Sequence, residues 1–387
     1  MFASRTNWNL KTNRLTEALE RHKASGRVLL DLSASNPTEC GFRYDGPGIM
    51  RALCHPASLQ YHPDPRGLAS ARQAVAGYYA GRSESVSIDD LVLTASTSEA
   101  YSFVFRLLCN AGDELLIPTP GYPLFDFLAE VNDVKLTRYP LFYDHGWHID
   151  LHALERAITP ATRGIIVVHP NNPAGHYTKD KEVLELNRMC SEKNLAIIAD
   201  EVFLDFSVSG ARLPSFVTNN GALSFTMSGI SKISGLPQMK FAWLAVSGPV
   251  EQKNEALARL ELIADTYLSL NAPVQLAAPV LLRQRTGFQQ QLMIRVVKNL
   301  AELDAQLGQA KHLSRLEVEG GWYAVLRVPA TRSDEDLAID LLEKHDVYVH
   351  PGHFFDFPGD GYLVLSLITP EPDFREGVER ILSFASA

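Results

Sequence analysis

The stretch that decides the fold is residues 164–200, GIIVVHPNNPAGHYTKDKEVLELNRMCSEKNLAIIAD. It begins with an apolar, β-branched run at Gly164–His169 and closes with a second such run at Leu195–Ala199. Between them, Asp180–Glu192 has the apolar spacing of an amphipathic helix. A strand, a helix and a second strand in this order predict two parallel strands, and uninterrupted apolar strands predict burial on both faces.

The same alternation extends outward in both directions. The other expected strands are Leu91–Thr94, Glu114–Ile117, Val134–Tyr139, Leu223–Met227 and Phe241–Val246. The other expected helices are Glu99–Leu108, Leu124–Val131 and Leu151–Ile158. Strands that alternate with helices predict an α/β fold, here a mostly parallel seven-stranded sheet flanked by helices.

The last third of the chain has a different character. Two long helices are expected at Val250–Leu268 and Gln289–Leu307, followed by short strands and one more helix. These strands are Leu313–Val318, Trp322–Val328, Val347–His350 and Tyr362–Leu367, and the helix is Ser333–His345. We therefore expect a large domain of residues 46–270 and a smaller α+β domain of residues 1–45 and 271–387.

Composition excludes several classes of protein. The chain has 387 residues, of which 46% are hydrophobic and 21% charged, as in folded globular proteins. A net charge of −9 argues against binding to nucleic acid, and no apolar run is long enough to span a membrane. The four cysteines are scattered without metal-ligand spacing, which predicts no metal site and a reducing compartment. We expect a cytoplasmic protein.

Polar residues follow several strands at the edge of the sheet where ligands bind. After the strand that ends at Thr94, Ser96 and Glu99 form a capping box that opens a helix. With hydroxyls at Thr97 and Ser98, this helix N-terminus is also suited to a phosphate group. A helix cap without a ligand is the alternative.

An aspartate ends the apolar strand Leu195–Ala199. Burial of the Asp200 carboxylate is costly unless it has a cationic partner. One such partner is the protonated ring nitrogen of a pyridinium cofactor. An arginine partner, or a cap on the next turn, is the alternative.

Two loops at the same edge carry a lysine and an amide. Lys232 lies in the Gly/Ser-rich loop Met227–Pro237, where partial desolvation, or the nearby charge of Lys240, turns an amine into a Schiff-base nucleophile. A solvated lysine is the alternative. The loop His169–Gly175 presents Asn172 between prolines, although turn formation alone explains such a loop.

Taken together, these motifs resemble those of the class I/II aminotransferases of the pyridoxal-phosphate fold-type I superfamily. The resemblance runs from about Ser35 to Arg380. The motifs that carry it are Asn171-Asn172-Pro173-Ala174-Gly175, Asp200-Glu201-Val202-Phe203, Ser231-Lys232 with Gly235-Leu236-Pro237, Thr119-Pro120-Gly121-Tyr122-Pro123 and His350-Pro351-Gly352.

The resemblance implies roles around the ring of pyridoxal 5'-phosphate. Lys232 would form the Schiff base and move protons between substrate and cofactor. Asp200 would pair with the pyridinium nitrogen, Asn172 would bind the phenolic oxygen, and Tyr122 would stack on the ring.

The resemblance also implies a phosphate site and a second subunit. Ser96, Thr97 and Ser98 would hold the phosphate, with Ser231 and Lys240 as further ligands. Tyr61 matches a tyrosine that reaches the phosphate of the neighbouring subunit. This implies a homodimer with shared active sites.

The sequence departs from the family pattern at four positions. Phe203 replaces a tyrosine that donates to the phenolic oxygen, and its loss should raise the pKa of the Schiff base. Gly229 replaces a phosphate-binding serine, beside which Ser228 could compensate, and Lys240 replaces an arginine. Val364 replaces the arginine that grips the substrate carboxylate.

The sequence leaves open which residue binds the substrate carboxylate in place of this arginine. Arg66, Arg43 and His353 lie in loops that should face the cleft, and Ser35 is a further substrate candidate. Equally, Arg66, Arg43 and His353 are each open to interpretation as plain surface residues, and the third option is a substrate with no carboxylate next to its amine.

The resemblance implies transamination between an amino acid or amine and a 2-oxo acid. A different reaction on the same cofactor, such as decarboxylation, elimination or oxidation, is the first alternative, because the protein decides the fate of the carbanion. A pyridoxal-phosphate-binding regulator without turnover is the second.

Overall fold

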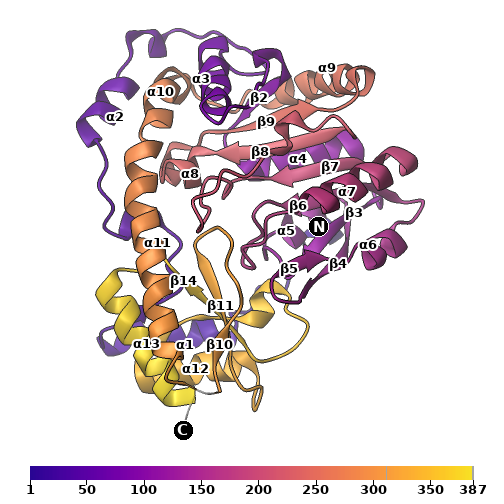
Figure 1. Ribbon diagram of the computed structural model, residues 1–387. Helices are drawn as coiled ribbons and strands as arrows, with labels where there is room; N and C mark the ends of the chain where they lie inside the picture. The colour runs from indigo at the N-terminus through magenta and orange to yellow at the C-terminus, as the bar shows by residue number, and fades with distance from the viewer. Residues whose placement is uncertain (311, 386–387) are drawn as a thin grey trace.

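The computed structural model describes residues 1–310 and 312–385. Figure 1 shows two parts connected by a long helix: a sheet with helices on its faces above, and a smaller α+β part below. The large sheet has eight strands in the order β2-β9-β8-β7-β6-β3-β4-β5. Their bounds are β2 Leu91–Thr94, β3 Glu114–Thr119, β4 Lys135–Tyr143, β5 Trp147–Ile149, β6 Thr162–Val168, β7 Ala196–Asp200, β8 Ser224–Gly229 and β9 Ala242–Ser247.

All seven strands that the sequence predicts are present, but the count of seven was wrong. The eighth strand, β5, pairs antiparallel with the end of β4 through Tyr143 and Trp147. A strand of three residues is too short to show an alternating pattern, so periodicity could not reveal it. The central strands β8, β7, β6, β3 and β4 are parallel, whereas β9 pairs antiparallel with both β8 and the edge strand β2, and β5 pairs antiparallel with β4 at the other edge.

The buried strands have apolar side chains on both faces. In β6, Ile165 belongs to the core cluster that includes Leu186 of α7, whereas the next residue, Ile166, belongs to the cluster under α4 and α9. Helices therefore cover both faces, as expected for parallel strands. The helices of this part are α2 Gly46–Leu53, α3 Ala69–Ala80, α4 Thr97–Leu108, α5 Phe125–Glu130, α6 Leu151–Ala157, α7 Asp180–Lys193, α8 Ile230–Ile233, α9 Val250–Tyr267 and α10 Ala272–Arg283.

The smaller part is built on a four-stranded sheet in the order β10-β11-β14-β13. Its strands are β10 Ser314–Arg315, β11 Tyr323–Arg327, β13 His350–Pro351 and β14 Tyr362–Ser366, with β1 Leu30–Asp31 paired to β12 Val347–Tyr348 beside it. Its helices are α1 Arg14–Ser25, α12 Asp334–His345 and α13 Glu371–Ala385. The long helix α11, Arg285–Leu307, runs from the large sheet into this part, where it packs on α13 (Figure 1).

The division into domains at residues 45/46 and 270/271 stays a prediction. Helix α10 begins at Ala272, on the small-domain side of that boundary, yet it packs against α2 and α3. This packing favours a boundary closer to the start of α11.

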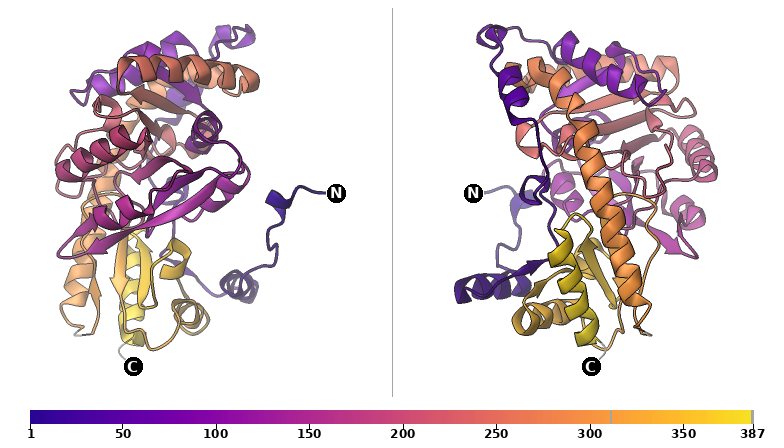
Figure 2. Two further views of the ribbon diagram at one scale, coloured as in Figure 1. Left: turned by 90° about the vertical axis from the view of Figure 1, so that its right-hand side faces the viewer. Right: turned by 60° about the vertical axis from the view of Figure 1, so that its left-hand side comes forward.

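The N-terminal segment before α1 crosses from the small part to the large one. Most of its residues are exposed, and Figure 2 shows it running outside the main body. Arg5 forms an ion pair with Asp133. The Trp8 ring lies edge-on to Phe127 of α5, with ring centroids 5.7 Å apart. The segment therefore lies against the helix that follows the Tyr122 loop.

Among the described residues, no helix combines the length and the apolar character needed to cross a bilayer.

Candidate functional site

Three neighbouring strands end where the candidate residues gather. Strand β6 leads into the loop that carries Asn172, β7 ends at Asp200, and β8 leads through Gly229 into α8 and Lys232. The register pairs Val168 with Asp200 and Asp200 with Met227, so the three strand ends lie side by side. The topology therefore brings an amide, a carboxylate and an amine to one edge of the sheet, as the sequence predicts.

The Lys232 amine lies among aromatic rings. Its Nζ is 5.0 Å from the centre of the Trp322 ring and 5.6 Å from that of Phe203. Burial lowers the pKa of Lys232 to about 8, and the negative charge of Asp200 opposes this shift only in part. At pH 7 about a tenth of the amine is therefore uncharged, and the uncharged form is the one that attacks a carbonyl carbon.

Asp200 is buried at 8% exposure, and two donors hold it in place. The Tyr101 hydroxyl donates to Oδ2 over 3.0 Å, and the Val202 backbone N–H donates to Oδ1 over 3.1 Å. Burial nevertheless raises the pKa of Asp200 to about 6, although both hydrogen bonds and the charge of Lys232 favour the carboxylate. A cation placed against this group would stabilise the carboxylate further.

The two adjacent asparagines differ in what they bind. Asn171 is fully occupied: its amide nitrogen donates to the Pro120 carbonyl, and its Oδ1 accepts from the Ala174 N–H. Asn172 is buried at 8% exposure, and its Oδ1 has no hydrogen-bond partner among the described residues. A buried acceptor without a partner is costly, so this amide oxygen fits a ligand or a water molecule that donates a hydrogen bond to it.

Tyr122 lies on the loop between β3 and α5. Its ring is 39% exposed and lies edge-on to Phe125 at 5.8 Å. Burial of the hydroxyl raises the pKa of Tyr122, and the charge of Asp200 raises it further, which places the two groups near each other. The Gly121 N–H donates to the Phe355 carbonyl over 2.9 Å, so the loop is tied to the small part. A partly exposed ring near Asp200 is suited to stack on a planar cofactor.

The N-terminus of α4 forms the candidate phosphate site. The Glu99 N–H donates to Ser96 Oγ over 3.2 Å, and Glu99 Oε2 accepts from the Ala95 N–H over 2.7 Å. Ser96 is thus the helix cap, while Thr97 is half-buried and Ser98 is exposed. A capped helix start with nearby hydroxyls favours an anion.

The other expected phosphate ligands are less closely defined. Ser231 precedes Lys232 on α8 and is half-buried, and Lys240 is exposed with a φ of 51°. Tyr61 is 78% exposed and, with Leu270 and Asn271, lines a different cavity, of about 420 Å³. Within one chain, therefore, Tyr61 does not join the group around Lys232.

The substrate candidates separate into two sets. Ser35 lines an open cavity of about 520 Å³ together with Lys232, Asn36, Thr38, Pro237 and Gln238. Arg66 instead donates to Glu261 over 2.7 Å. Arg43 and His353 are exposed, and Val364 is buried at 1% exposure. Of these candidates, only Ser35 shares a cavity with the lysine.

Sequence reasoning missed three residues of the site. Trp322 faces the amine, Tyr101 holds Asp200, and Glu201 begins a buried polar network next to Asp200. Tyr101 follows the Ser96–Glu99 cap on the same helix, so its position was the signal that could have found it. Trp322 lies far along the chain and carries no such signal.

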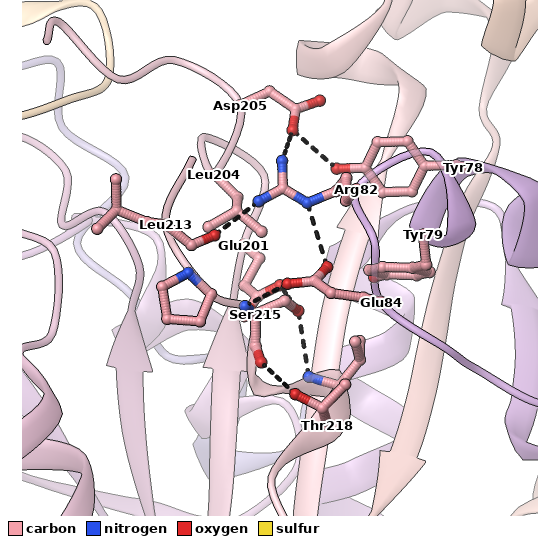
Figure 3. A network of polar contacts seen from close by, with 12 residues as sticks. Tyr78, Tyr79, Arg82, Glu84, Glu201, Leu204, Asp205, Leu213, Ser215 and Thr218 are labelled. Carbon is pink, nitrogen blue, oxygen red and sulfur yellow. Dashed lines mark hydrogen bonds and ion pairs between the residues drawn. The ribbon is translucent and has the colours of Figure 1, made fainter. Parts of the chain in front are cut away.

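Figure 3 shows the network that starts at Glu201. The Phe216 N–H and the Ser215 hydroxyl donate to the Glu201 carboxylate, and the Ser215 N–H donates to Glu84 over 2.7 Å. Arg82 binds Glu84 over 3.2 Å and also forms an ion pair with Asp205. Burial raises the pKa of Glu201 to about 8, and the charge of Glu84 adds to this shift.

The raised pKa of Glu201 predicts that the free energy of unfolding depends on pH. A Glu201→Gln variant should lose this dependence. Unfolding releases a proton from Glu201 at any pH between its ordinary pKa of 4.5 and about 8. The free energy of unfolding of the wild type should therefore fall as pH rises across this window, by on the order of 3 kcal/mol. Urea unfolding of both proteins at pH 5 to 8 measures the difference, and parallel curves would contradict it.

The chain was compared with known proteins. The family model "Aminotransferase class I and II" matches residues 56–381. The glutamate-pyruvate aminotransferase AlaA of Escherichia coli (strain K12) is 26% identical over 95% of this chain and 93% of its own length. The alanine aminotransferase of Mycobacterium tuberculosis (strain ATCC 25618 / H37Rv) is 27% identical over 94% and 87%.

Solved structures share the fold. The alanine aminotransferase from Pyrococcus furiosus superposes with a TM-score of 0.90 at 22% identity, and the alignment covers 100% of this chain and 99% of that one. An aspartate aminotransferase from Thermotoga maritima has a TM-score of 0.85 at 20% identity and covers both chains in full. The large mostly parallel sheet and the smaller α+β part are therefore the architecture of these enzymes.

Proposed function

This chain belongs to the class I and II aminotransferases, enzymes that use pyridoxal phosphate, and we propose that Lys232 is the residue that holds the cofactor as a Schiff base. The observation that carries the proposal is the grouping at one sheet edge of a partly deprotonated amine, a buried carboxylate and a buried amide without a partner. These groups are Lys232, Asp200 and Asn172. A structural role alone gives no reason for all three to meet.

The residues present fit the ring of the cofactor. When bound, pyridoxal phosphate supplies an electron sink that stabilises negative charge on the carbon next to the amino group. Asp200 would hold the protonated ring nitrogen, since it is a buried carboxylate that lacks a close cation. The amide nitrogen of Asn172 would donate to the phenolic oxygen, and the ring of Tyr122 would pack on the ring face. Phe203 contributes only apolar contact, because it has no polar atom to donate.

Lys232 would also move the proton in the reaction. In the cofactor-free protein its amine has a pKa of about 8, which is matched to accepting and returning a proton near neutral pH. The rings of Phe203 and Trp322 provide an apolar surface next to this amine, which also borders the open cavity that Ser35 lines.

The phosphate would bind at the N-terminus of α4. Ser96, Thr97 and Ser98 provide hydroxyls there, and Ser231 and Lys240 would approach from the lysine side. Tyr61 is exposed in the single chain, and we propose that it reaches the phosphate of a second copy in a homodimer. Four free cysteines, two of them buried, support a place in the reducing cytoplasm.

We propose that the substrates are an amino acid donor and a 2-oxo acid acceptor. Relatives named for alanine, for glutamate and pyruvate, and for tyrosine support this class. The donor would enter the cavity between Ser35 and Lys232. Since Val364 is buried and Arg66 is paired with Glu261, neutral groups such as the Ser35 hydroxyl would meet the carboxylate on this side.

Absorption spectra test the proposal directly. The purified protein, incubated with pyridoxal phosphate, should show a Schiff-base band in the near-ultraviolet or visible range. A panel of L-amino acids should convert it to the band of the amine form, and a 2-oxo acid should restore it. Conversion by carboxylate-free amines alone would overturn the proposed substrate class. No band at all would overturn the role of Lys232.

A further inference from the structure

The turn that carries Lys232 has little structure of its own. Helix α8 spans only Ile230–Ile233, and the chain then reverses at Gly235, which has a φ of 64°. The Leu236 N–H donates to the Ile230 carbonyl over 3.0 Å and closes the turn. A single helical turn this short is marginal by itself, so its position depends on what holds it from outside.

Three side chains hold the turn from outside. The Gln289 amide nitrogen donates to the Ile233 carbonyl over 2.9 Å, and the Tyr44 hydroxyl donates to the Gly235 carbonyl over 2.9 Å. Phe288 packs against Gly235 so closely that a Cβ there would lie 2.4 Å from its ring. Of these contacts, the one from Gln289 is made to the residue next to Lys232.

Gln289 is itself fixed by a buried carboxylate. Its amide nitrogen also donates to Asp205 over 2.8 Å. Asp205 is held in turn by the Arg82 guanidinium and by the Tyr78 hydroxyl at 3.2 Å, as Figure 3 shows. The amide is therefore pinned between the Asp205 carboxylate and the lysine turn, and its rotamer is set by both.

Gln289 also lies on the one helix that joins the two parts of the molecule. Helix α11 passes beside α8 and continues into the small part, where it packs on α13 (Figure 1). A shift of α11 would thus reach the turn through two neighbouring side chains: Gln289 at the Ile233 carbonyl and Phe288 at Gly235.

We propose that Gln289 is a positioning residue that fixes Lys232 for proton transfer by anchoring the Ile233 carbonyl to Asp205 and to helix α11. This inference rests on the proposed role of Lys232 as the reacting amine. Gln289 touches no reacting atom. It acts through the backbone of the turn, and it determines where the amine lies relative to Asp200 on β7 and to the rings of Phe203 and Trp322.

Loss of this anchor should reduce turnover more than substrate affinity. Displacement of a reacting group by about 1 Å costs up to about 100-fold in rate. The Gln289→Met variant keeps the length of the side chain but cannot donate. We expect its kcat to fall by about 10- to 100-fold, with KM within about threefold of the wild type. Gln289→Lys keeps a donor for both oxygens and should recover most of the rate.

The matched control is Gln290→Met, at the exposed neighbour of Gln289 on the same helix. Thermal unfolding of all variants separates a general loss of stability from a local effect. If Gln289→Met and Gln290→Met have the same kcat, or if Gln289→Lys is as slow as Gln289→Met, the proposal fails.

A second readout needs neither cofactor nor turnover. Competitive labelling of the cofactor-free protein with acetic anhydride between pH 6 and 11, followed by mass spectrometry of the Lys232 peptide, measures the pKa of this amine. In Gln289→Met the better hydrated amine should titrate at higher pH than in the wild type, whereas Gln290→Met should match the wild type. An unchanged titration would overturn the proposal. If the titration shifts but no Schiff base forms on Lys232, the anchor stands and the proposed function fails.

Discussion

A Lys232→Ala variant is expected to lose transamination by at least about 10⁴-fold while it still folds and binds the cofactor. On the proposed assignment the lysine supplies both the nucleophile and the proton-transfer group, and general acid–base catalysis alone contributes about 10²–10⁴-fold. The substitution leaves its neighbours Trp322 and Phe203 unchanged, and Asp200 and Asn172 would still hold the ring. Single-turnover absorption measurements with an amino acid donor give the rate.

Chemical rescue provides the control for this variant. Methylamine is small enough to enter the space that the lysine side chain leaves, and it can take over the proton transfer. A rate that rises with methylamine concentration in Lys232→Ala, but not in the wild type, would assign the lost function to the amine. A variant with more than about a tenth of the wild-type rate would contradict the proposed role.

An Asp200→Asn variant is expected to lose about 10²- to 10³-fold in kcat, with weaker binding of pyridoxal phosphate. The substitution keeps the shape of the side chain and removes the charge that, as proposed, would hold the ring nitrogen protonated, and preorganised electrostatic groups contribute on this scale. The graded control is Tyr101→Phe, which removes one donor to Asp200 but leaves the carboxylate. It should cost about tenfold or less.

The pKa of Asp200 also predicts how the affinity for the cofactor depends on pH. In the cofactor-free protein this pKa is about 6, so the carboxyl is protonated below that pH and cannot pair with a cation. Cofactor affinity of the wild type should therefore fall as pH drops through 6, whereas the affinity of Asp200→Asn should not change there for this reason. Equilibrium titration with pyridoxal phosphate at pH 5 to 8 compares the two proteins.

Sequence periodicity was sufficient to predict the large sheet because its strands are buried on both faces. Ile165 and Ile166 face opposite clusters, and such strands are continuous apolar runs. Five of the longer helices escaped prediction: α1, α2 and α13, which are clearly amphipathic, and α3 and α10, whose patterns are weaker. Helix α3, Ala69–Ala80, is rich in alanine, and α10 carries Pro279 in its interior.

The site could be predicted only where it lies next to strand ends. Asp200, Asn172 and Lys232 each follow a recognisable strand, so their meeting at one edge follows from the topology. Trp322 and Gln289 reach the same lysine from the distant end of the chain, through tertiary packing that no local pattern encodes. The same limit applies to Arg66, whose partner Glu261 is 195 residues away.

Because of the position of Trp322, cofactor binding can also be followed by intrinsic tryptophan fluorescence, without an added dye. The indole lies 5.0 Å from the amine that would carry the cofactor, whereas Trp8 lies against Phe127, Trp147 against Tyr143 and Trp243 against Tyr79. A bound chromophore that absorbs where indole emits would quench Trp322 by energy transfer. Binding and release of the cofactor could then be followed in real time by intrinsic fluorescence. The Trp322→Phe variant, which lacks this indole, is the control.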